Sequence, residues 1–269
     1  MRFLDRGGHR IAWNETGSGT PVLLIMGHRY SSAMWYPVLE DWADRYRLIW
    51  FDNRGTGQSG DVRRTSVEEM TADALAVLDA AGVQTAHVYG VSMGGGIALE
   101  FGLRYPERTR SLLLGCTMAK TPDIPGKPDW LIKLLYRLAP MLMKLAKPEA
   151  VRKGYGDAAP ADAVDRDLKT LKADPYSLRG VTAQALAISH YSVDEAEVRA
   201  IRLPTLVLHG TQDQAVPYAA GAKLADMIPG ARLVTFQDIG HNYFIGAREQ
   251  ARTEAERFID EVEAGRAGA

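Results

Sequence analysis

Short apolar runs alternate along the chain with longer amphipathic segments. The run from Val22 to Met26 is continuously apolar, which is typical of a strand buried on both faces of a parallel sheet. Similar runs, with a weaker one at 9–14, predict strands over 9–14, 22–26, 47–51, 87–91, 111–115, 205–209 and 232–236. Apolar residues at helical spacing predict helices over 67–81, 94–104 and 249–262. The alternation predicts an α/β fold with a mostly parallel central sheet and helices on both faces.

The alternation breaks in the stretch 118–202. That stretch has a helical pattern interrupted by prolines and no convincing buried strand, and strand spacing resumes at Leu203 and Pro204. We therefore expect an α/β core made of residues 1–117 and 203–269. Residues 118–202 are predicted to form a helical lid, or cap, that is inserted into this core and lies over the sheet.

Composition and charge narrow the class of protein. The 269 residues contain 32 Lys and Arg against 33 Asp and Glu, and this balance argues against a general nucleic-acid binder. The single cysteine, Cys116, excludes an internal disulfide framework and fits a reducing compartment. No apolar run is long enough for a signal peptide or a membrane span. We expect a cytoplasmic protein without nucleic-acid or membrane partners, and a homodimer is left open.

The segment Gly90-Val91-Ser92-Met93-Gly94 follows a predicted buried strand and opens a predicted helix. A nucleophilic serine needs this geometry, because a sharp turn from strand to helix lifts its hydroxyl out of the sheet. The helix N-terminus also favours developing negative charge. A glycine-rich phosphate loop is the alternative, but the Gly-Lys-Ser/Thr ending of such a loop is missing. Ser92 is therefore a candidate nucleophile.

Asp213 and His241 follow the predicted strands 205–209 and 232–236. Open α/β sheets place their sites at the carboxyl ends of strands. A serine needs a base to take its proton, and the base needs an acid to orient it. The chain order Ser, Asp, His is the one expected of this topology. Ser92, Asp213 and His241 are therefore predicted to meet as a catalytic triad.

Four motifs stand in order along the chain and resemble the α/β-hydrolase superfamily. They are residues 24–28, residues 51–59, residues 90–94, and Asp213 together with Gly240-His241. The chain is similar to esterase- and lactonase-like members, such as those labelled 3-oxoadipate enol-lactonase. The resemblance implies an α/β-hydrolase fold in which Ser92 is the nucleophile, His241 the general base and Asp213 its orienting acid.

The resemblance also implies an oxyanion hole made by the backbone N–H groups of His28 and Met93. Met26-Gly27 stands where the family commonly has His-Gly, and the histidine comes one place later. The side chains of His28 and Arg29 are therefore candidates for substrate contact. The alternative is that they pack against the lid or face solvent.

Further candidates for the substrate-binding wall, each with ordinary core packing as the alternative, are Trp35, His190 and Tyr191. Cys116 and three histidines in or beside strands, His9, His87 and His209, are interpreted as packing residues. No pair of histidines, cysteines or acids has the spacing of a metal site, so we expect neither a metal nor a cofactor.

The resulting functional hypothesis is a serine hydrolase that cleaves a small or medium carboxylic ester or lactone through an acyl-enzyme on Ser92. Two alternatives stay open. The same triad could serve a C–C bond hydrolase, a perhydrolase or a cofactor-independent oxygenase. The scaffold could also belong to a regulatory protein that senses a ligand, because fold alone does not decide function.

Overall fold

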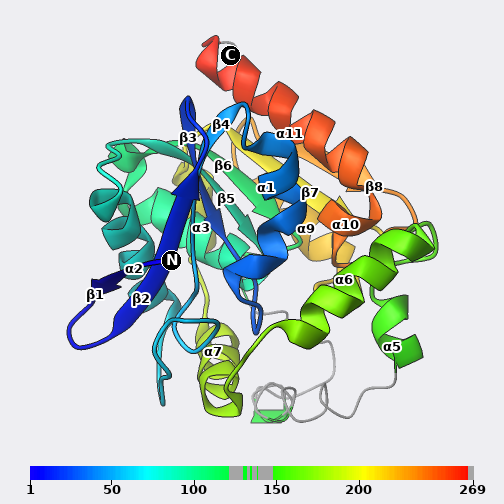
Figure 1. Cartoon of the computed structure of the whole chain (residues 1–269). Coiled ribbons are helices and arrows are strands. Elements are labelled where there is room, and N and C mark those ends of the chain that lie inside the picture. The colour runs from blue at the N-terminus through cyan, green and yellow to red at the C-terminus, as the bar shows by residue number, and fades with distance from the viewer. Residues whose placement is uncertain (121–129, 132–133, 135–137, 139–147, 266–269) are drawn as a thin grey trace.

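An eight-stranded sheet forms the centre of the computed structural model, which describes residues 1–120, 130–131, 134, 138 and 148–265. Its strand order is β1-β2-β4-β3-β5-β6-β7-β8 (Figure 1). The strands pair in parallel from β4 onward, whereas β1 with β2 and β2 with β4 are antiparallel. The strand bounds are β1 Arg2–Asp5, β2 Arg10–Thr16, β3 Thr20–Ile25, β4 Tyr46–Phe51, β5 Ala86–Val91, β6 Thr109–Gly115, β7 Thr205–Gly210 and β8 Arg232–Phe236. The predicted mostly parallel sheet is confirmed.

The described α-helices connect these strands and flank the sheet. Their bounds are α1 Tyr36–Trp42, α2 Val67–Ala80, α3 Met93–Arg104, α5 Pro148–Lys153, α6 Ala161–Ala173, α7 Leu178–His190, α8 Glu195–Ala200, α9 Tyr218–Met227, α10 Tyr243–Gly246 and α11 Arg248–Glu263. The three predicted helices correspond to α2, α3 and α11. The pattern missed β1, whose residues are mostly exposed at the sheet edge and therefore form no apolar run.

Two apolar clusters fill the spaces on either side of the sheet. One cluster joins Val88 of β5 to side chains of α2, α3 and α9. The other joins the neighbouring Tyr89 to side chains of α1, α10 and α11. Successive side chains of a strand point to opposite faces, so a strand covered on both faces is apolar at most of its positions. This explains the continuous apolar runs in the sequence (Figure 1).

Helices α5, α6 and α7, which lie between β6 and β7 in the chain, gather beyond one end of the sheet (Figure 1). Asp174, just after α6, accepts hydrogen bonds from the backbone N–H and the hydroxyl of Ser31. In α7, Gln184 donates to the carbonyl of Arg54 and accepts from the N–H of Arg29. These contacts hold α6 and α7 against the loops that follow β3 and β4.

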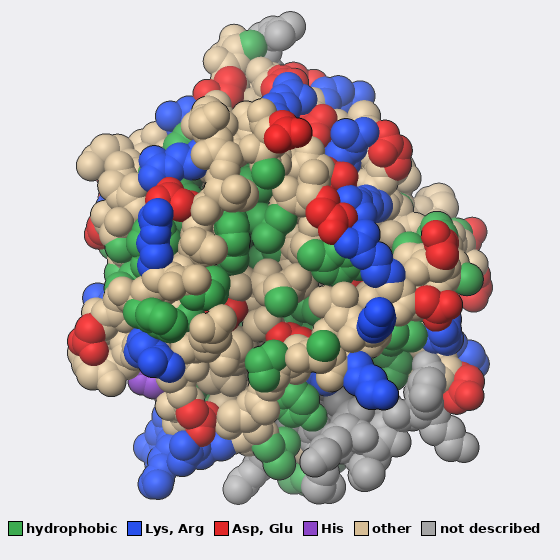
Figure 2. All heavy atoms as spheres, in the orientation of Figure 1, with side chains coloured by type: hydrophobic (Ala, Val, Ile, Leu, Met, Phe, Trp, Pro, Cys, Tyr) green, Lys and Arg blue, Asp and Glu red, His purple; other side chains and the backbone are tan. Residues whose placement is uncertain are grey.

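Charged side chains of both signs are mixed over the face of the molecule in Figure 2. Many of them are paired across elements: Arg45 bonds Asp260 of α11, and Arg248 of α11 bonds Asp41 of α1. Among the described residues, no helix has the length and apolar character needed to span a membrane.

Candidate active site

Ser92 occupies a strained turn between β5 and α3. Its φ of 58° and ψ of −121° lie where L-residues are rarely found. The Ser92 N–H donates to the carbonyl of Gly115 at 2.7 Å. The Ser92 carbonyl accepts from the N–H of Gly95 at 2.9 Å and from the hydroxyl of Thr117 at 2.8 Å. Surrounding bonds therefore hold this conformation, which is the nucleophile elbow predicted from the sequence.

The glycines at 90 and 94 allow the elbow to form. A Cβ on Gly90 would lie 2.0 Å from the carbonyl oxygen of Gly94, and a Cβ on Gly94 would lie 2.0 Å from that of Ile25. The start of α3 therefore packs directly on the ends of β5 and β3. As a result, a Cβ on Gly27, in the loop after β3, would lie only 3.2 Å from Cβ of Ser92.

His241 and Asp213 form the hydrogen-bonded pair that the sequence predicts. His241 Nδ1 lies 2.7 Å from Asp213 Oδ2. The other carboxylate oxygen accepts from the N–H groups of Ala215 at 2.8 Å and Val216 at 2.9 Å. Burial opposes ionisation of Asp213, but the charge of His241 and the bonds from His209, His241 and Val216 outweigh it and hold the pKa of this carboxyl well below its usual range. An ionised Asp213 keeps a proton on Nδ1 of His241.

A cavity of about 340 Å³ brings Ser92 and His241 together, since both line it. In the part of the chain that the structure describes, no hydrogen bond joins the two side chains. Catalytic hydrogen bonds are often long in unliganded enzymes and tighten when substrate binds. The remaining wall is largely apolar, with Val67, Val91, Met118, Ile188, Val216 and Phe244.

The backbone N–H groups of His28 and Met93 border the same cavity. His28 follows Gly27 in the loop after β3, and Met93 is the first residue of α3. Within the described ranges neither N–H has a hydrogen-bond partner. Two such donors beside a nucleophile can bind a developing oxyanion, and the positive end of the α3 dipole adds to the effect.

The imidazole of His28 binds the inserted helices. Its Nε2 lies 2.9 Å from the carbonyl oxygen of Val181 in α7, so Nε2 carries a proton and donates. Burial lowers the pKa of His28, against the opposing effect of that hydrogen bond. His28 therefore lines the cavity as a neutral group that links the loop after β3 to α7.

Of the other predicted substrate contacts, Tyr191 lines the cavity and donates to the carbonyl of Gly96 at 3.0 Å. Trp35 does not reach the cavity. It is fully buried behind it, where its ring packs on Tyr89 and Phe244 at centroid distances of 5.1 and 5.7 Å. Its place is therefore in the core on the α1 and α11 face.

Arg29 and His190 also lie outside the lining of this cavity. The guanidinium of Arg29 stacks over the rings of Tyr30 and Tyr176, at 5.4 and 4.6 Å from their centroids. His190, the last residue of α7, borders a separate cavity. The sequence could not separate these positions from those that face Ser92, because the turn of α7 and the path of the loop decide them.

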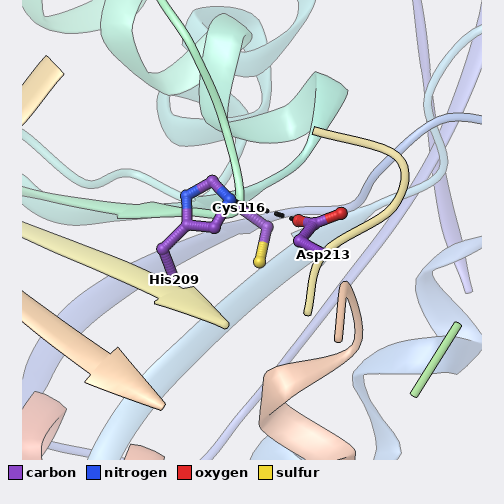
Figure 3. A group of neighbouring side chains, drawn as sticks. All are labelled: Cys116, His209 and Asp213. Atoms are coloured by element: carbon purple, nitrogen blue, oxygen red, sulfur yellow. Dashed lines mark ion pairs between the residues drawn. The ribbon is translucent and has the colours of Figure 1, made fainter. Parts of the chain in front are cut away.

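The sequence analysis missed the role of His209. This fully buried side chain in β7 lies beside Asp213 (Figure 3), with Nε2 3.2 Å from Asp213 Oδ2 and 3.0 Å from the carbonyl oxygen of Val216. Because both neighbours are acceptors, Nε2 carries a proton and donates to Asp213. The available signal was a histidine four residues before the acid, at the end of the same predicted strand.

Cys116 completes the group in Figure 3. Its ligand atom and those of His209 and Asp213 lie within 4.8 Å of one another, as a metal site would require. The hydrogen bonds fit a metal poorly. His209 Nε2 is protonated, and a Cβ on Gly221 would lie only 2.0 Å from the other ring nitrogen, which leaves little space there for an ion. Burial and the charge of Asp213 raise the pKa of the Cys116 thiol, which favours its protonated form.

Fold and site together define a class: an α/β protein with a serine on a nucleophile elbow and a His–Asp pair at the carboxyl ends of the sheet strands. Residues 20–247 match the family model for the alpha/beta hydrolase fold, and the chain belongs to this family. The predicted superfamily resemblance is confirmed, and the chain is a hydrolase of the alpha/beta hydrolase type, similar to esterases.

The similar proteins are named as hydrolases of different substrates. A protein provisionally named carbamate hydrolase RutD, from Azorhizobium caulinodans, is 32% identical over 87% of this chain and 88% of its own length. A 2-hydroxy-6-oxo-6-phenylhexa-2,4-dienoate hydrolase from Comamonas testosteroni is 30% identical over 88% of this chain and 86% of its own. The structure of an esterase from Thermogutta terrifontis has a TM-score of 0.83 at 25% identity, and the match covers 97% of this chain and 99% of the esterase. These names share hydrolysis but no single substrate.

Proposed function

We propose that this protein hydrolyses a small or medium carboxylic ester or lactone through an acyl-enzyme on Ser92. The observation that carries the proposal is the cavity shared by Ser92, on its strained elbow, and His241, which is bonded to an ionised Asp213. The bonds around Asp213 orient His241 before a substrate arrives, which is what a serine nucleophile needs from its base.

In the proposed reaction, the Ser92 hydroxyl attacks the carbonyl carbon while Nε2 of His241 takes its proton. The tetrahedral intermediate then collapses, and His241 gives that proton to the departing alcohol oxygen. A water molecule repeats the sequence on the acyl-enzyme, releases the acid and restores the serine. Asp213 stabilises the imidazolium in both halves of the cycle.

We assign the stabilisation of the tetrahedral oxyanion to the backbone N–H groups of His28 and Met93. Each donor of this kind contributes about 2.7–4 kcal/mol of transition-state stabilisation in hydrolases where it has been removed. A backbone group supplies the donor, so methionine at position 26 in place of the family's histidine is compatible with the hole.

We further propose that residues 118–202 act as the lid over this site. Val151 and Tyr155, and also Ile188 and Tyr191 of this segment, contribute to the cavity wall. A cavity of about 340 Å³ with an apolar wall favours a compact, partly apolar substrate.

Covalent labelling tests the nucleophile. A fluorophosphonate should add one equivalent to the intact wild-type chain, and Ser92→Ala should abolish both this adduct and ester hydrolysis. Ser189→Ala is the matched control, because this buried serine in α7 does not line the cavity and should leave both intact. Full esterase activity in Ser92→Ala would refute the proposal.

A substrate panel separates the reactions that one triad could run. Short aryl esters and lactones should be turned over faster than carbon–carbon ring-cleavage products or peroxide-dependent substrates. Faster turnover of the latter would keep the triad but change the reaction. Labelled Ser92 with no turnover of any of these, together with tight ligand binding, would favour a sensing role.

We also propose that the protein works in a reducing compartment such as the cytoplasm, because its single cysteine is buried and protonated.

Size-exclusion chromatography at working concentration decides between a monomer and a homodimer.

A further inference from the structure

A second cavity, of about 310 Å³, lies beside the proposed catalytic one. Val67 and Tyr191 line both cavities, so the two share a wall. The second cavity lies between the loop that leads into α2 and the C-terminal half of α7. None of the catalytic roles proposed above uses it.

Two adjacent arginines, Arg63 and Arg64, line this second cavity and are exposed. In the residues that the structure describes, neither guanidinium has an acid, a hydrogen-bond acceptor or an aromatic ring as its partner. Their neighbours differ: Arg54 bonds Asp73, and Arg179 bonds Asp61. The two positive charges at the cavity are therefore uncompensated by ion pairs.

With the other polar groups of the cavity included, its net charge is still positive. Among the described residues that line the cavity, Glu68 is the one acid, and the Ser66 hydroxyl lowers its pKa. The N-terminus of α2 adds partial positive charge at Ser66 and Val67. His190 donates from Nδ1 to the carbonyl of Leu186 at 2.7 Å, which leaves Nε2 available to a ligand.

We propose that this second cavity binds an anionic group at the far end of the substrate, a carboxylate or a phosphate, while the scissile ester lies at Ser92. This inference rests on the proposed function and adds a substrate class to it. Guanidinium groups recognise carboxylate and phosphate oxygens through paired N–H donors. A substrate that occupies both cavities would have to pass Val67 and Tyr191, which line both, so its anion would be joined to the ester by a chain. A compact ester without such a chain would use only the catalytic cavity.

The test compares two esters of equal chain length, monomethyl suberate and methyl octanoate, in the wild type and in the double variant Arg63→Ala/Arg64→Ala. We expect the double variant to raise the KM for monomethyl suberate about three- to tenfold, as the loss of two partly exposed ion pairs would. The kcat should change less than twofold, as should both constants for methyl octanoate. The difference should shrink in 0.5 M NaCl, because salt screens exposed charges.

Two controls isolate charge from structure. Arg63→Lys/Arg64→Lys keeps the charges and should retain at least half of the preference for the anionic ester. Arg199→Ala removes an exposed arginine of α8 that does not line either cavity and should leave the preference unchanged. An analogue of monomethyl suberate in which a terminal phosphate replaces the free carboxylate shows which anion the second cavity prefers.

Equal effects of the double variant on both esters, or no effect on either, would overturn the inference. Failure of the proposed function has a different signature: wild type would hydrolyse neither ester, and Ser92 would not be labelled. Calorimetric titration with suberate gives a readout independent of catalysis. Binding to the wild type that weakens at least threefold in the double variant supports the subsite, and equal binding to both proteins contradicts it.

Discussion

At the scale of single residues, the Asp213 carboxylate is surrounded by several hydrogen-bond donors besides His241. Its oxygens accept from two backbone N–H groups and lie within 3.2 Å of both His241 Nδ1 and His209 Nε2. These bonds hold its pKa below the usual range, so Asp213 stays ionised as the pH falls. Protonation of Asp213 would therefore not explain a loss of activity in mildly acidic solution.

His209 should support activity through its bond to Asp213. His209→Leu removes the donor at similar size, and His209→Gln keeps an amide N–H near the position of Nε2. A hydrogen bond to a charged group contributes about 1.5–3 kcal/mol, so His209→Leu should lower kcat/KM at least tenfold. His209→Gln should recover most of that loss. Melting temperatures serve as the control: if both variants lose activity and stability equally, His209 is a packing residue, as the sequence suggested.

At the scale of elements, the site depends on three segments that meet without side chains between them. The first turn of α3 packs on the end of β3 at Gly94 and on the end of β5 at Gly90. Helix α3 therefore begins with residues of poor helix propensity, because close approach matters more there than local stability. As a result, His28, Ser92 and Met93 all line one cavity.

Gly94→Ala should separate these segments. The new methyl group would lie 2.0 Å from the carbonyl oxygen of Ile25, so α3 must shift away from β3. We expect a loss of about 1–3 kcal/mol in the free energy of unfolding, as for other overpacked sites. A displacement of 1 Å at a catalytic group typically costs about a hundredfold in rate. Gly60→Ala, with its nearest atom at 3.6 Å, is the control, and similar effects in both variants would contradict this account.

At the scale of the whole molecule, the buried His87 connects the last helix, α11, to the centre of the sheet. His87 lies in β5 at the opposite end from Ser92, with Nδ1 2.7 Å from the hydroxyl of Ser111. Its Nε2 lies 3.2 Å from the Glu263 carboxylate at the end of α11, which Arg110 also binds at 2.8 Å. Burial lowers the pKa of His87 to about 4, so the ring is neutral in the folded protein near neutral pH.

From the lowered pKa of His87 we predict that the free energy of unfolding decreases in acid. The folded-state pKa of His87 is about 4 and the ordinary value is 6.5, so the unfolded chain binds the proton more readily. Stability is therefore fully present above pH 6.5 and declines as the pH falls toward 4, by on the order of 2–3 kcal/mol. Thermal unfolding between pH 7 and 4 measures the decline, which His87→Gln should reduce. An unchanged pH dependence in that variant would assign the decline to other groups.

Most of the architecture could be predicted from local patterns in the sequence. The buried strands can be recognised in the sequence because a strand covered on both faces is mostly apolar, and Val22 to Met26 is apolar throughout. The elbow shows because Gly90, Ser92 and Gly94 are required by contacts made within a few residues. Edge strand β1 and the short helices α1 and α10 leave no such trace, since their stability comes from what they pack against.

The sequence by itself determined the seven strands from β2 to β8, the helices α2, α3 and α11, the elbow at Ser92 and the two partners that follow later strands. These depend on periodicity and chain order, which are local properties. Only the tertiary structure decided which side chains share a cavity: Tyr191 lines the same cavity as Ser92, Trp35 is buried behind that cavity, and His190 borders a second cavity with Arg63 and Arg64. Those placements depend on how helices far apart in the chain rotate and pack against one another, and no short stretch of sequence encodes that.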